Sequence, residues 1–559
     1  MKNDTSSNII RQPGSRRQTM GVIKALKEAL FTKLLSESSL YNQILNSLTD
    51  KDEQIYAGEM LARAADKFPN KTALVLQDKS LTYKELYYRS ILLSKKLISS
   101  GVKPRDKVLM CFENSIEFVV TYFAIMQIGA ICVPLNTFLH EKEIEYIIYD
   151  AEPSVIIVSN ELKHKFQNKT QKFRLLFGSD IDLKTPLSNN LEEIEKGFEL
   201  VKLSRNELCL LLYTSGTTGV PKGVMLSSKN IITNAVQCSA RFGKMVNFTK
   251  NEKGVFEANE RFFSALPLFH VFAQNTCMWF PLLIGSTIII VPKIDRRDIL
   301  EGLLKKPTVF LGVPALYGLL CLMKTAPLDS IKFFVSGGDA MSDKIRTAFA
   351  MVYGRKICNG YGLTEAAPVV AVNIENVDFH SHMVGCPVVG LECQVRDKNG
   401  EIVKSGEQGS LWIKGDNVML GYYKSPQETE KVLQKDWLNT GDLAYLTDDN
   451  LLAVVGRSKE LIIHKGFNIY PQEVENILLS HPSVFKVAVI GREDITSGQV
   501  PIAYVALKFS SSNIEKQLRD FCLERLASYK IPRKFICLDD LPMNATGKID
   551  KKQLVSGVK

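Results

Sequence analysis

The eleven cysteines of this 559-residue chain form no C-x-x-C pair, and their number is odd. These absences argue against a disulfide framework and against a zinc site built on paired thiolates. Most of the cysteines stand in apolar runs, as Cys111 and Cys277 do. We therefore expect small buried side chains in a protein of a reducing compartment.

The first eighteen residues contain no apolar core and no small-residue cleavage site, so we expect no secretory signal. In Met20–Leu35, leucine and isoleucine recur at helical spacing, and the lysines lie off that stripe. This pattern predicts an amphipathic helix that lies either on an anionic membrane surface or against the body of the protein. We expect a cytoplasmic protein and, under the first placement, one that touches the inner membrane surface.

The stretch from Phe262 to Pro292 holds no Asp, Glu, Lys or Arg. Its length alone would suit a membrane-spanning helix. Pro267, Pro281 and Gly285 interrupt it, so we expect buried helix and strand with room for an apolar ligand.

Lysine and arginine outnumber aspartate and glutamate by 70 to 60, a formal net charge of +10. Such a charge favours anionic partners, for example nucleotides, CoA or anionic lipid. No motif of an RNA- or DNA-binding module accompanies it, so nucleic acid is not an expected partner.

Apolar strand patterns alternate with helix patterns, as in Lys107–Phe112, Ser115–Ile128 and Ala130–Pro134. This alternation is typical of parallel sheets in the α/β class. Short strands between turns indicate a β-rich subdomain from about Val388, and a mixed α and β pattern returns after Arg457. The expected units are an N-terminal basic extension 1–50, a large domain 51–457 that includes the β-rich subdomain 388–457, and a small α+β C-terminal domain 458–559.

A loop rich in glycine and hydroxyl side chains follows the apolar run Leu208–Leu212. Glycines let backbone N–H groups approach phosphate oxygens, and hydroxyls and a lysine add donors, so the loop predicts an oligophosphate site. It is not a Walker A loop, because Lys222 follows a proline and precedes Gly223. The candidate phosphate ligands are Thr214, Ser215, Gly216, Thr217, Thr218, Gly219 and Lys222.

This loop, YTSGTTGVPKG at 213–223, resembles the phosphate-binding motif of the adenylate-forming superfamily of acyl-CoA synthetases, peptide-synthetase adenylation domains and firefly luciferase. Similar segments run in order along the chain from about Tyr56 to Lys551. LTYKEL at 81–86 and GAICVPLN at 129–136 are two that precede the loop. The resemblance is greatest to fatty-acid:CoA ligases. It implies an AMP-forming acid:CoA ligase that uses ATP, Mg²⁺ and CoA, with no other metal and with a mobile C-terminal domain.

The resemblance also implies roles for single residues. In NGYGLTE at 359–365, Tyr361 would offer a flat face to adenine, and Glu365 would hold Mg²⁺ together with Thr214. Asp339 departs from the family pattern, in which many relatives carry a small residue. The further nucleotide contacts implied are Gly337, Gly338, Asp339, Asn359, Gly360, Gly362 and Thr364.

Asp442 in TGD at 440–442 resembles the ribose-binding carboxylate, and Arg457 follows fifteen residues later to reach ribose or phosphate. Lys548, in LPMNATGKI at 541–549, would bridge the substrate carboxylate and the α-phosphate. No general base is needed, because a carboxylic acid with a pKa of about 4–5 is already ionised at neutral pH. The catalytic residues implied are Lys548, His270 and Lys222, with His270 between the nucleotide and acyl sites.

The family alternates between two orientations of its C-terminal domain, which places the hinge here at Lys459. In the second orientation, Lys465 and Gly466 would line the path of CoA. Relatives of the luciferase type often carry lysine where this chain has Ile463, so no role is assigned at that position.

The segments His270–Leu283 and Val309–Leu320 are apolar and contain no charged residue that would meet the ammonium group of an amino acid. They favour a fatty acid of medium to long chain. An aromatic acid of the coumarate type, and a carrier protein as acceptor in place of CoA, remain alternatives. The expected acyl pocket comprises His270, Phe272, Gly312 and Gly338.

Overall fold

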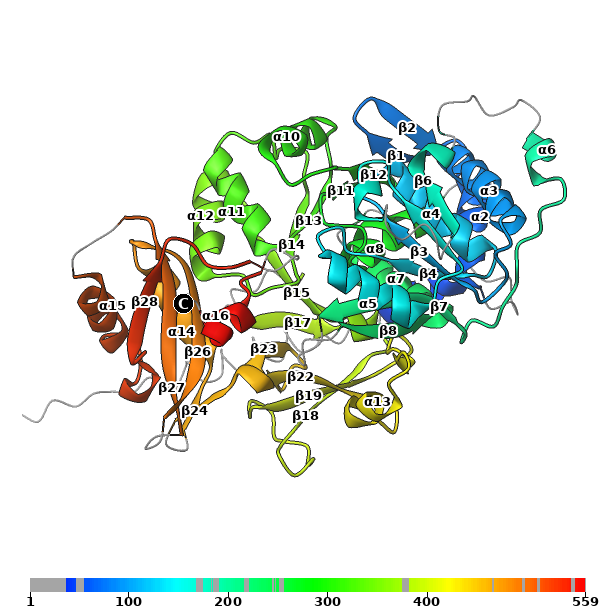
Figure 1. Ribbon diagram of the computed structural model, residues 1–559. Helices are drawn as coiled ribbons and strands as arrows, with labels where there is room; N and C mark the ends of the chain where they lie inside the picture. The colour runs from blue at the N-terminus through cyan, green and yellow to red at the C-terminus, as the bar shows by residue number, and fades with distance from the viewer. Residues whose placement is uncertain are drawn as a thin grey trace, which may run out of the picture.

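The computed structural model describes residues 37–46, 55–166, 174–181, 183, 191–215, 221–243, 246, 248–250, 256–374, 382–464, 467–494, 498–509, 513–543 and 548–557. Within these ranges the strands form a fourteen-stranded sheet, a seven-stranded sheet, a five-stranded sheet and a two-stranded hairpin of β9 (Phe248–Lys250) and β10 (Phe256–Ala258). The expected mixed α/β class is confirmed (Figure 1).

One sheet carries the phosphate-loop hairpin. In spatial order its strands are β20 (Gly421–Tyr422), β8 (Pro221–Ser227), β7 (Leu208–Ser215), β4 (Ile131–Pro134), β3 (Lys107–Cys111), β5 (Val155–Val158) and β6 (Arg174–Phe177). Strands β3 to β7 run parallel, as the alternating pattern predicted, whereas β8 is antiparallel to both β7 and β20. The hairpin is thus one edge of an otherwise parallel sheet.

The largest sheet joins a parallel half to an antiparallel half. In order its strands are β18 (Glu392–Arg396), β19 (Gly409–Lys414), β22 (Trp437–Leu446), β23 (Leu452–Arg457), β17 (Met383–Pro387), β16 (Val369–Val372), β15 (Cys358–Gly362), β14 (Phe333–Ser336), β13 (Val309–Gly312), β11 (Arg261–Ser264), β12 (Thr287–Ile290), β1 (Thr72–Leu76) and β2 (Lys79–Thr82), with β21 (Leu433–Gln434) beside β22. Because β13, β14 and β15 are parallel, their carboxyl ends meet at one edge of the sheet, where ligands of such sheets bind.

Helices cover both sheets and carry the main core. The helices of the large domain are α2 (Ala57–Lys67), α3 (Tyr83–Ser99), α4 (Ile116–Gln127), α5 (Glu141–Ala151), α6 (Leu191–Glu195), α7 (Ser228–Phe242), α8 (Val271–Gln274), α9 (Phe280–Leu283), α10 (Arg296–Leu304), α11 (Pro314–Met323), α12 (Asp343–Tyr353) and α13 (Pro426–Val432). Apolar faces of α2, α4 and α7 pack with strands of both sheets in one cluster. All eleven cysteines are free thiols, and most are buried as expected.

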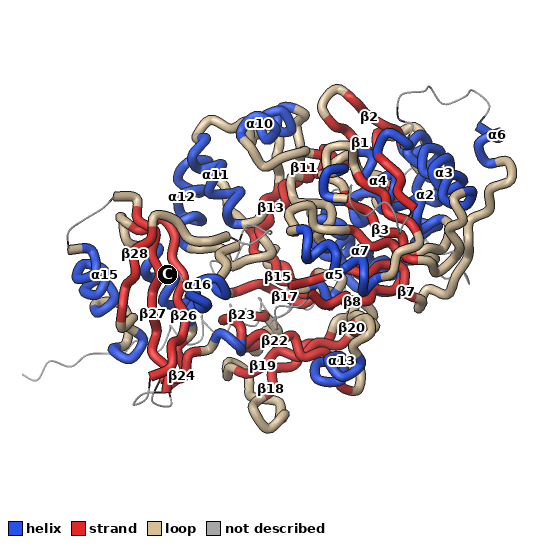
Figure 2. The backbone as a smooth tube through the Cα atoms, viewed as in Figure 1, coloured by secondary structure: helices blue, strands red, loops and turns tan. Residues whose placement is uncertain are grey.

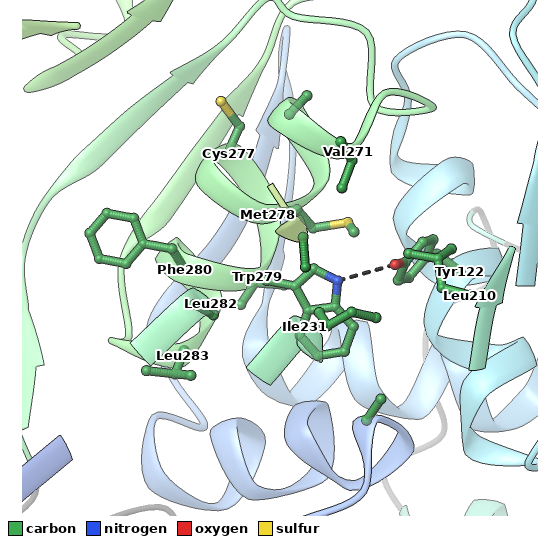
Figure 3. Close-up of a cluster of buried hydrophobic side chains, with 14 of the residues drawn as sticks. Tyr122, Leu210, Ile231, Val271, Cys277, Met278, Trp279, Phe280, Leu282 and Leu283 are labelled. Atoms are coloured by element: carbon green, nitrogen blue, oxygen red, sulfur yellow. Dashed lines mark hydrogen bonds between the residues drawn. The ribbon is translucent and has the colours of Figure 1, made fainter. Parts of the chain in front are cut away.

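The uncharged stretch from Phe262 to Pro292 folds inside the large domain. It contains β11, α8, a π-helical turn at Asn275–Trp279, α9 and β12. Trp279 is fully buried and donates its indole N–H to the hydroxyl of Tyr122 on α4 at 3.2 Å (Figure 3). The expected buried helix and strand are therefore confirmed, and no helix among the described residues is long and apolar enough to cross a membrane.

Residues 37–46 form a helix that docks on the large domain. Glu37 and Arg241 of α7 make an ion pair of 2.9 Å, and both side chains are buried. Ile44 enters the main core. This short helix is thus part of the body of the protein, while the predicted amphipathic helix Met20–Leu35 lies outside the described residues.

Strands that follow Arg457 leave the large sheet. After a turn at Ser458–Glu460, β24 (Ile462–His464), β25 (Phe467–Ile469), β26 (Val484–Asp494), β27 (Gly498–Leu507) and β28 (Lys534–Leu538) pair with one another. This C-terminal lobe also contains α14 (Pro471–Ser480), α15 (Ile514–Leu523) and α16 (Lys551–Gly557). It lies beside α12 and β23 (Figures 1 and 2).

Candidate active site

The phosphate-loop hairpin places Thr214 opposite Lys222. Strand β7 continues to Ser215, beyond the apolar run that predicted it, because it pairs with β8 in the register Thr214 to Lys222 and Ser215 to Pro221. The two predicted phosphate ligands at the base of the loop are therefore cross-strand neighbours. Gly216, Thr217, Thr218 and Gly219 lie outside the described residues.

Lys222 is held by two residues that the sequence did not reveal. Its ammonium donates to Glu428 of α13 at 2.5 Å and lies 5.2 Å from the ring centroid of Tyr422. Hydrogen bonds from Lys222 and from Lys431 lower the pKa of Glu428 to about 2. Glu428 is thus ionised at neutral pH, and its ion pair positions Lys222.

Glu365 lies on the turn Thr364–Ala366, which packs against β8. Its Oε1 accepts from the hydroxyl of Tyr422 at 2.9 Å, and its backbone oxygen accepts from the N–H of Met419. The described residues contain no cluster of three His, Cys, Asp or Glu side chains. One carboxylate with the Thr214 hydroxyl fits Mg²⁺ that takes its remaining ligands from phosphate and water, as this ion commonly does.

Asp442 and Arg457 face each other on β22 and β23. Asp442 is 3% exposed; its Oδ1 lies 2.9 Å from Nε of Arg457, and its Oδ2 accepts the hydroxyl of Tyr361. Burial raises the pKa of Asp442, and Arg457 and Tyr361 oppose that rise. The geometry therefore joins three predicted nucleotide ligands from separate motifs around one buried carboxylate.

The edge formed by β14 and β15 holds the remaining predicted nucleotide residues. Asn359 donates to the backbone oxygen of Met383 at 3.1 Å and accepts from Arg346 of α12 at 3.0 Å, so its amide has two structural partners. Gly360 and Gly362 lie on β15, which ends beside the turn of Thr364.

Gly337 and Gly338 follow β14 and form a close contact with α8. A Cβ on Gly337 would lie 2.9 Å from Cζ of Phe272, and Gly338 has φ +79°, a backbone conformation that favours glycine. Asp339 is exposed, and its carboxylate accepts from the N–H of Ala340. The small residues here permit the ring of Phe272 to lie against the backbone.

His270 is the N-cap of α8, and its Nδ1 accepts from the N–H of Phe272 at 3.3 Å. Burial and the charge of Lys548 lower the pKa of His270 to about 4. The ring is therefore neutral at pH 7, and its proton is on Nε2. Lys548 also lowers the pKa of Asp442, so this C-terminal lysine lies within electrostatic reach of both residues.

The expected acyl pocket is partly filled by the protein's own side chains. A Cβ on Gly312 would meet Phe310 and Tyr317 at 3.1 Å and Leu316 at 3.3 Å, so the space beside this glycine is occupied. Phe272 is half-buried at the edge of the main core. Among the expected pocket residues, the structure brings Phe272 together with His270 and Gly338.

Lys459 lies in the turn Ser458–Glu460, between the last strand of the large sheet and the first strand of the C-terminal lobe. This position is the covalent link between the two parts of the site. Lys465 and Gly466 lie outside the described residues.

Comparisons with known proteins show the family of this chain. The model of the AMP-binding enzyme family matches residues 61–423, and that of the AMP-binding enzyme C-terminal domain matches residues 473–548. The long-chain-fatty-acid–CoA ligase of Bacillus subtilis is 31% identical over 532 residues, which cover 89% of this chain and 93% of the relative. The 2-succinylbenzoate–CoA ligase of Bacillus cereus is 30% identical over 492 residues, 87% of this chain and 95% of that protein.

Among solved structures, the o-succinylbenzoate–CoA synthetase of Bacillus subtilis in complex with ATP and magnesium matches with a TM-score of 0.77 and 28% identity, over 89% of this chain and 99% of that one. The fold and the site define an adenylate-forming enzyme. The chain belongs to the AMP-binding enzyme family, in which it is an ATP-dependent, AMP-forming acid:CoA ligase.

Proposed function

We propose that the acid activated by this ligase is a fatty acid of medium to long chain. The observation that carries this proposal is the chemistry of the protein around His270. No Asp, Glu, Lys or Arg occurs in the segments His270–Leu283 and Val309–Leu320. No charged side chain of these segments would therefore pair with the ammonium of an amino acid or with a second carboxylate. The similarity to the long-chain-fatty-acid–CoA ligase of Bacillus subtilis supports the same substrate class.

An aromatic acid is the second candidate. Phe310, Tyr317 and Leu316 fill the space at Gly312, and a shortened pocket suits a compact ring better than a long chain. A relative named for 2-succinylbenzoate has almost the same identity to this chain. Transfer to a carrier protein in place of CoA is a further alternative, at the acceptor step.

In the proposed first half-reaction, the ionised acid attacks the α-phosphorus of ATP and pyrophosphate leaves. Lys222 and the phosphate loop hold the departing phosphates, Asp442 and Arg457 hold the ribose, and Tyr361 flanks the adenine. Mg²⁺, held by Glu365 and Thr214, would offset negative charge on the phosphates. Lys548 bridges the two reacting groups, and the Nε2–H of neutral His270 orients the carboxylate.

In the second half-reaction, the thiol of CoA attacks the acyl carbon and AMP leaves. This step does not use Lys548 at the carbonyl. The C-terminal lobe rotates about Lys459, which removes Lys548 and presents Lys465 and Gly466 to CoA. A turn residue between two separate sheets suits a hinge.

The test is a panel of acids with ATP and Mg²⁺, in which AMP and pyrophosphate are measured with and without CoA. Palmitate and shorter straight-chain acids should give the highest kcat/KM, and benzoate and coumarate should give at least tenfold less. A higher kcat/KM for an aromatic acid would reject the fatty-acid proposal. If a thioester forms only when a carrier protein replaces CoA, then CoA is rejected as the acceptor.

We propose further that Met20–Leu35 makes a peripheral contact with anionic membrane. A variant without residues 1–34 keeps Glu37 and therefore its ion pair with Arg241. It should lose binding to phosphatidylglycerol vesicles while adenylate formation is unchanged. Equal binding by the full chain and this variant would reject the contact.

A further inference from the structure

Lys344 is a lysine of the large domain whose hydrogen-bond partners all belong to the C-terminal lobe. Its ammonium donates to the backbone oxygens of Leu479 at 2.8 Å, Val484 at 3.2 Å and His481 at 3.4 Å. Leu479 is in the last turn of α14, His481 is its C-cap, and Val484 begins β26. The ammonium thus meets two carbonyl oxygens at the carboxyl end of α14 and a third at the start of β26.

Lys344 lies at an unfavourable position on its own helix and at a favourable position for the neighbouring lobe. It is the second residue of α12, where the positive end of that helix's own dipole disfavours a cation. The carboxyl end of α14 has the opposite sign and leaves backbone oxygens without partners inside the helix. A lysine that is unfavourable for its own helix is therefore favourable for the helix of the neighbouring lobe.

The same orientation of the lobe brings Lys548 to the active site. Lys548 and α14 belong to one lobe, and the charge of Lys548 acts on His270 and Asp442 of the large domain. If the lobe rotates about Lys459, the oxygens of α14 leave Lys344 as Lys548 leaves His270. The two contacts form and break together.

We propose that Lys344 is a positioning residue that holds the C-terminal lobe in the orientation for adenylate formation by capping the carboxyl end of α14. It touches no substrate and acts through Lys548. The inference rests on the proposed role of Lys548 and on rotation at Lys459, but not on which acid is the substrate.

The charge of Lys344 is disfavoured at this interface, so the cap rests on its hydrogen bonds. Burial and the nearby Lys508 lower the pKa of Lys344 to about 8. The other charged or titratable groups at the interface are His481 and Arg525 of the lobe and Asp343 and Arg346 of α12. The pKa of His481 is lowered by burial and by the charges of Lys344 and Arg525. Because burial against the lobe lowers this pKa, docking favours the neutral amine, which still donates hydrogen bonds, so the adenylation orientation should become more populated as pH rises through about 8.

The decisive measurement is the ratio of two half-reaction rates in Lys344→Met. Adenylate formation is followed as pyrophosphate release without CoA, and thioester formation is followed from supplied palmitoyl-adenylate and CoA. Because each half-reaction draws on one orientation, the ratio of rates follows the ratio of populations whichever predominates. The ratio should fall about tenfold, in line with the loss of one to two net hydrogen bonds.

Lys324→Met is the matched control, because it removes the same charge from an exposed position after α11. Its ratio should equal that of the wild type. Lys344→Arg keeps a charge that persists above pH 12. Its ratio should stay constant from pH 7 to 9.5, while the wild-type ratio rises.

A substrate-independent measurement keeps the inference testable if no acid in the panel is activated. The pKa of His270, followed by NMR in histidine-labelled protein and assigned with His270→Gln, should rise in Lys344→Met because Lys548 moves away. An unchanged ratio together with an unchanged pKa of His270 would overturn the role of Lys344. Equal loss of both half-reactions would also overturn it, whereas a wild-type enzyme inactive on fatty acids would reject only the proposed substrate.

Discussion

Replacement of Arg457 by methionine tests the electrostatics of the nucleotide site most directly. The change leaves Asp442, which is 3% exposed, with Tyr361 as its remaining side-chain hydrogen-bond donor among the contacts described above. Methionine keeps much of the aliphatic stem and removes the charge. The perturbation is therefore confined to the partner of one buried carboxylate.

The size of the effect follows from the geometry. Two unit charges 4 Å apart attract by about 4 kcal/mol at an effective dielectric constant of about 20. Arg457 is 54% exposed, and solvent screening reduces the attraction to about 1–2 kcal/mol. A loss of that size at the ribose-binding carboxylate should raise the KM for ATP by about five- to thirtyfold.

The pH dependence of the Arg457→Met variant gives a second signature. Burial raises the pKa of Asp442 and Arg457 opposes the rise, so the pKa rises further in the variant. Because ribose binding needs the ionised carboxylate, activity should fall at a higher pH than in the wild type as the solution is acidified. The folded variant also holds the Asp442 proton more tightly than the unfolded chain does, so its deficit in Tm should be larger at pH 7 than at pH 5.

The assay is the initial rate of pyrophosphate release against ATP concentration from pH 5 to 8.5, with Tm measured in the same buffers. Arg457→Lys retains a charge and should keep the acid limb near that of the wild type. An acid limb that is identical in Arg457→Met and the wild type would refute the account of Asp442.

Three further substitutions test other parts of the site. Lys548→Ala should reduce pyrophosphate release by about 10²–10³-fold and spare thioester formation from supplied acyl-adenylate; equal loss of both contradicts the two-orientation account. Gly337→Ala should raise the KM for the acid more than that for ATP, because the new methyl group lies 2.9 Å from Phe272; unchanged acid kinetics would exclude that contact from the acid site. Glu428→Gln should lower the KM for ATP, because the carboxylate no longer competes with phosphate for Lys222; a higher KM would mean that Glu428 chiefly positions the lysine.

Local patterns in the sequence predicted the elements that the core defines. The apolar runs of β3 and β4 were found within a residue or two, since a strand buried on both faces is apolar throughout its length. The end of β7 was missed, because its last residues are polar and are fixed by pairing with β8.

The partners of the site residues were not predictable in the same way. Glu428 is 206 residues from Lys222 in the sequence and belongs to no motif, so only the fold brings them together. Lys344 likewise belongs to no motif, and its proposed role depends on a helix end more than 130 residues later in the sequence. Motifs identify groups that a ligand touches, whereas groups that position them are fixed by tertiary contacts.

The state of His270 shows how the site separates its charges. Two causes lower its pKa, burial and Lys548, and the proposed rotation of the lobe would remove the second. Burial lowers this pKa more than Lys548 does, and the ring is neutral at pH 7 in the orientation that the structure shows. With Nδ1 engaged by the N–H of Phe272, His270 offers one neutral donor through Nε2 throughout the cycle. In the proposed cycle the site therefore changes its positive charge by moving Lys548 and not by protonating His270.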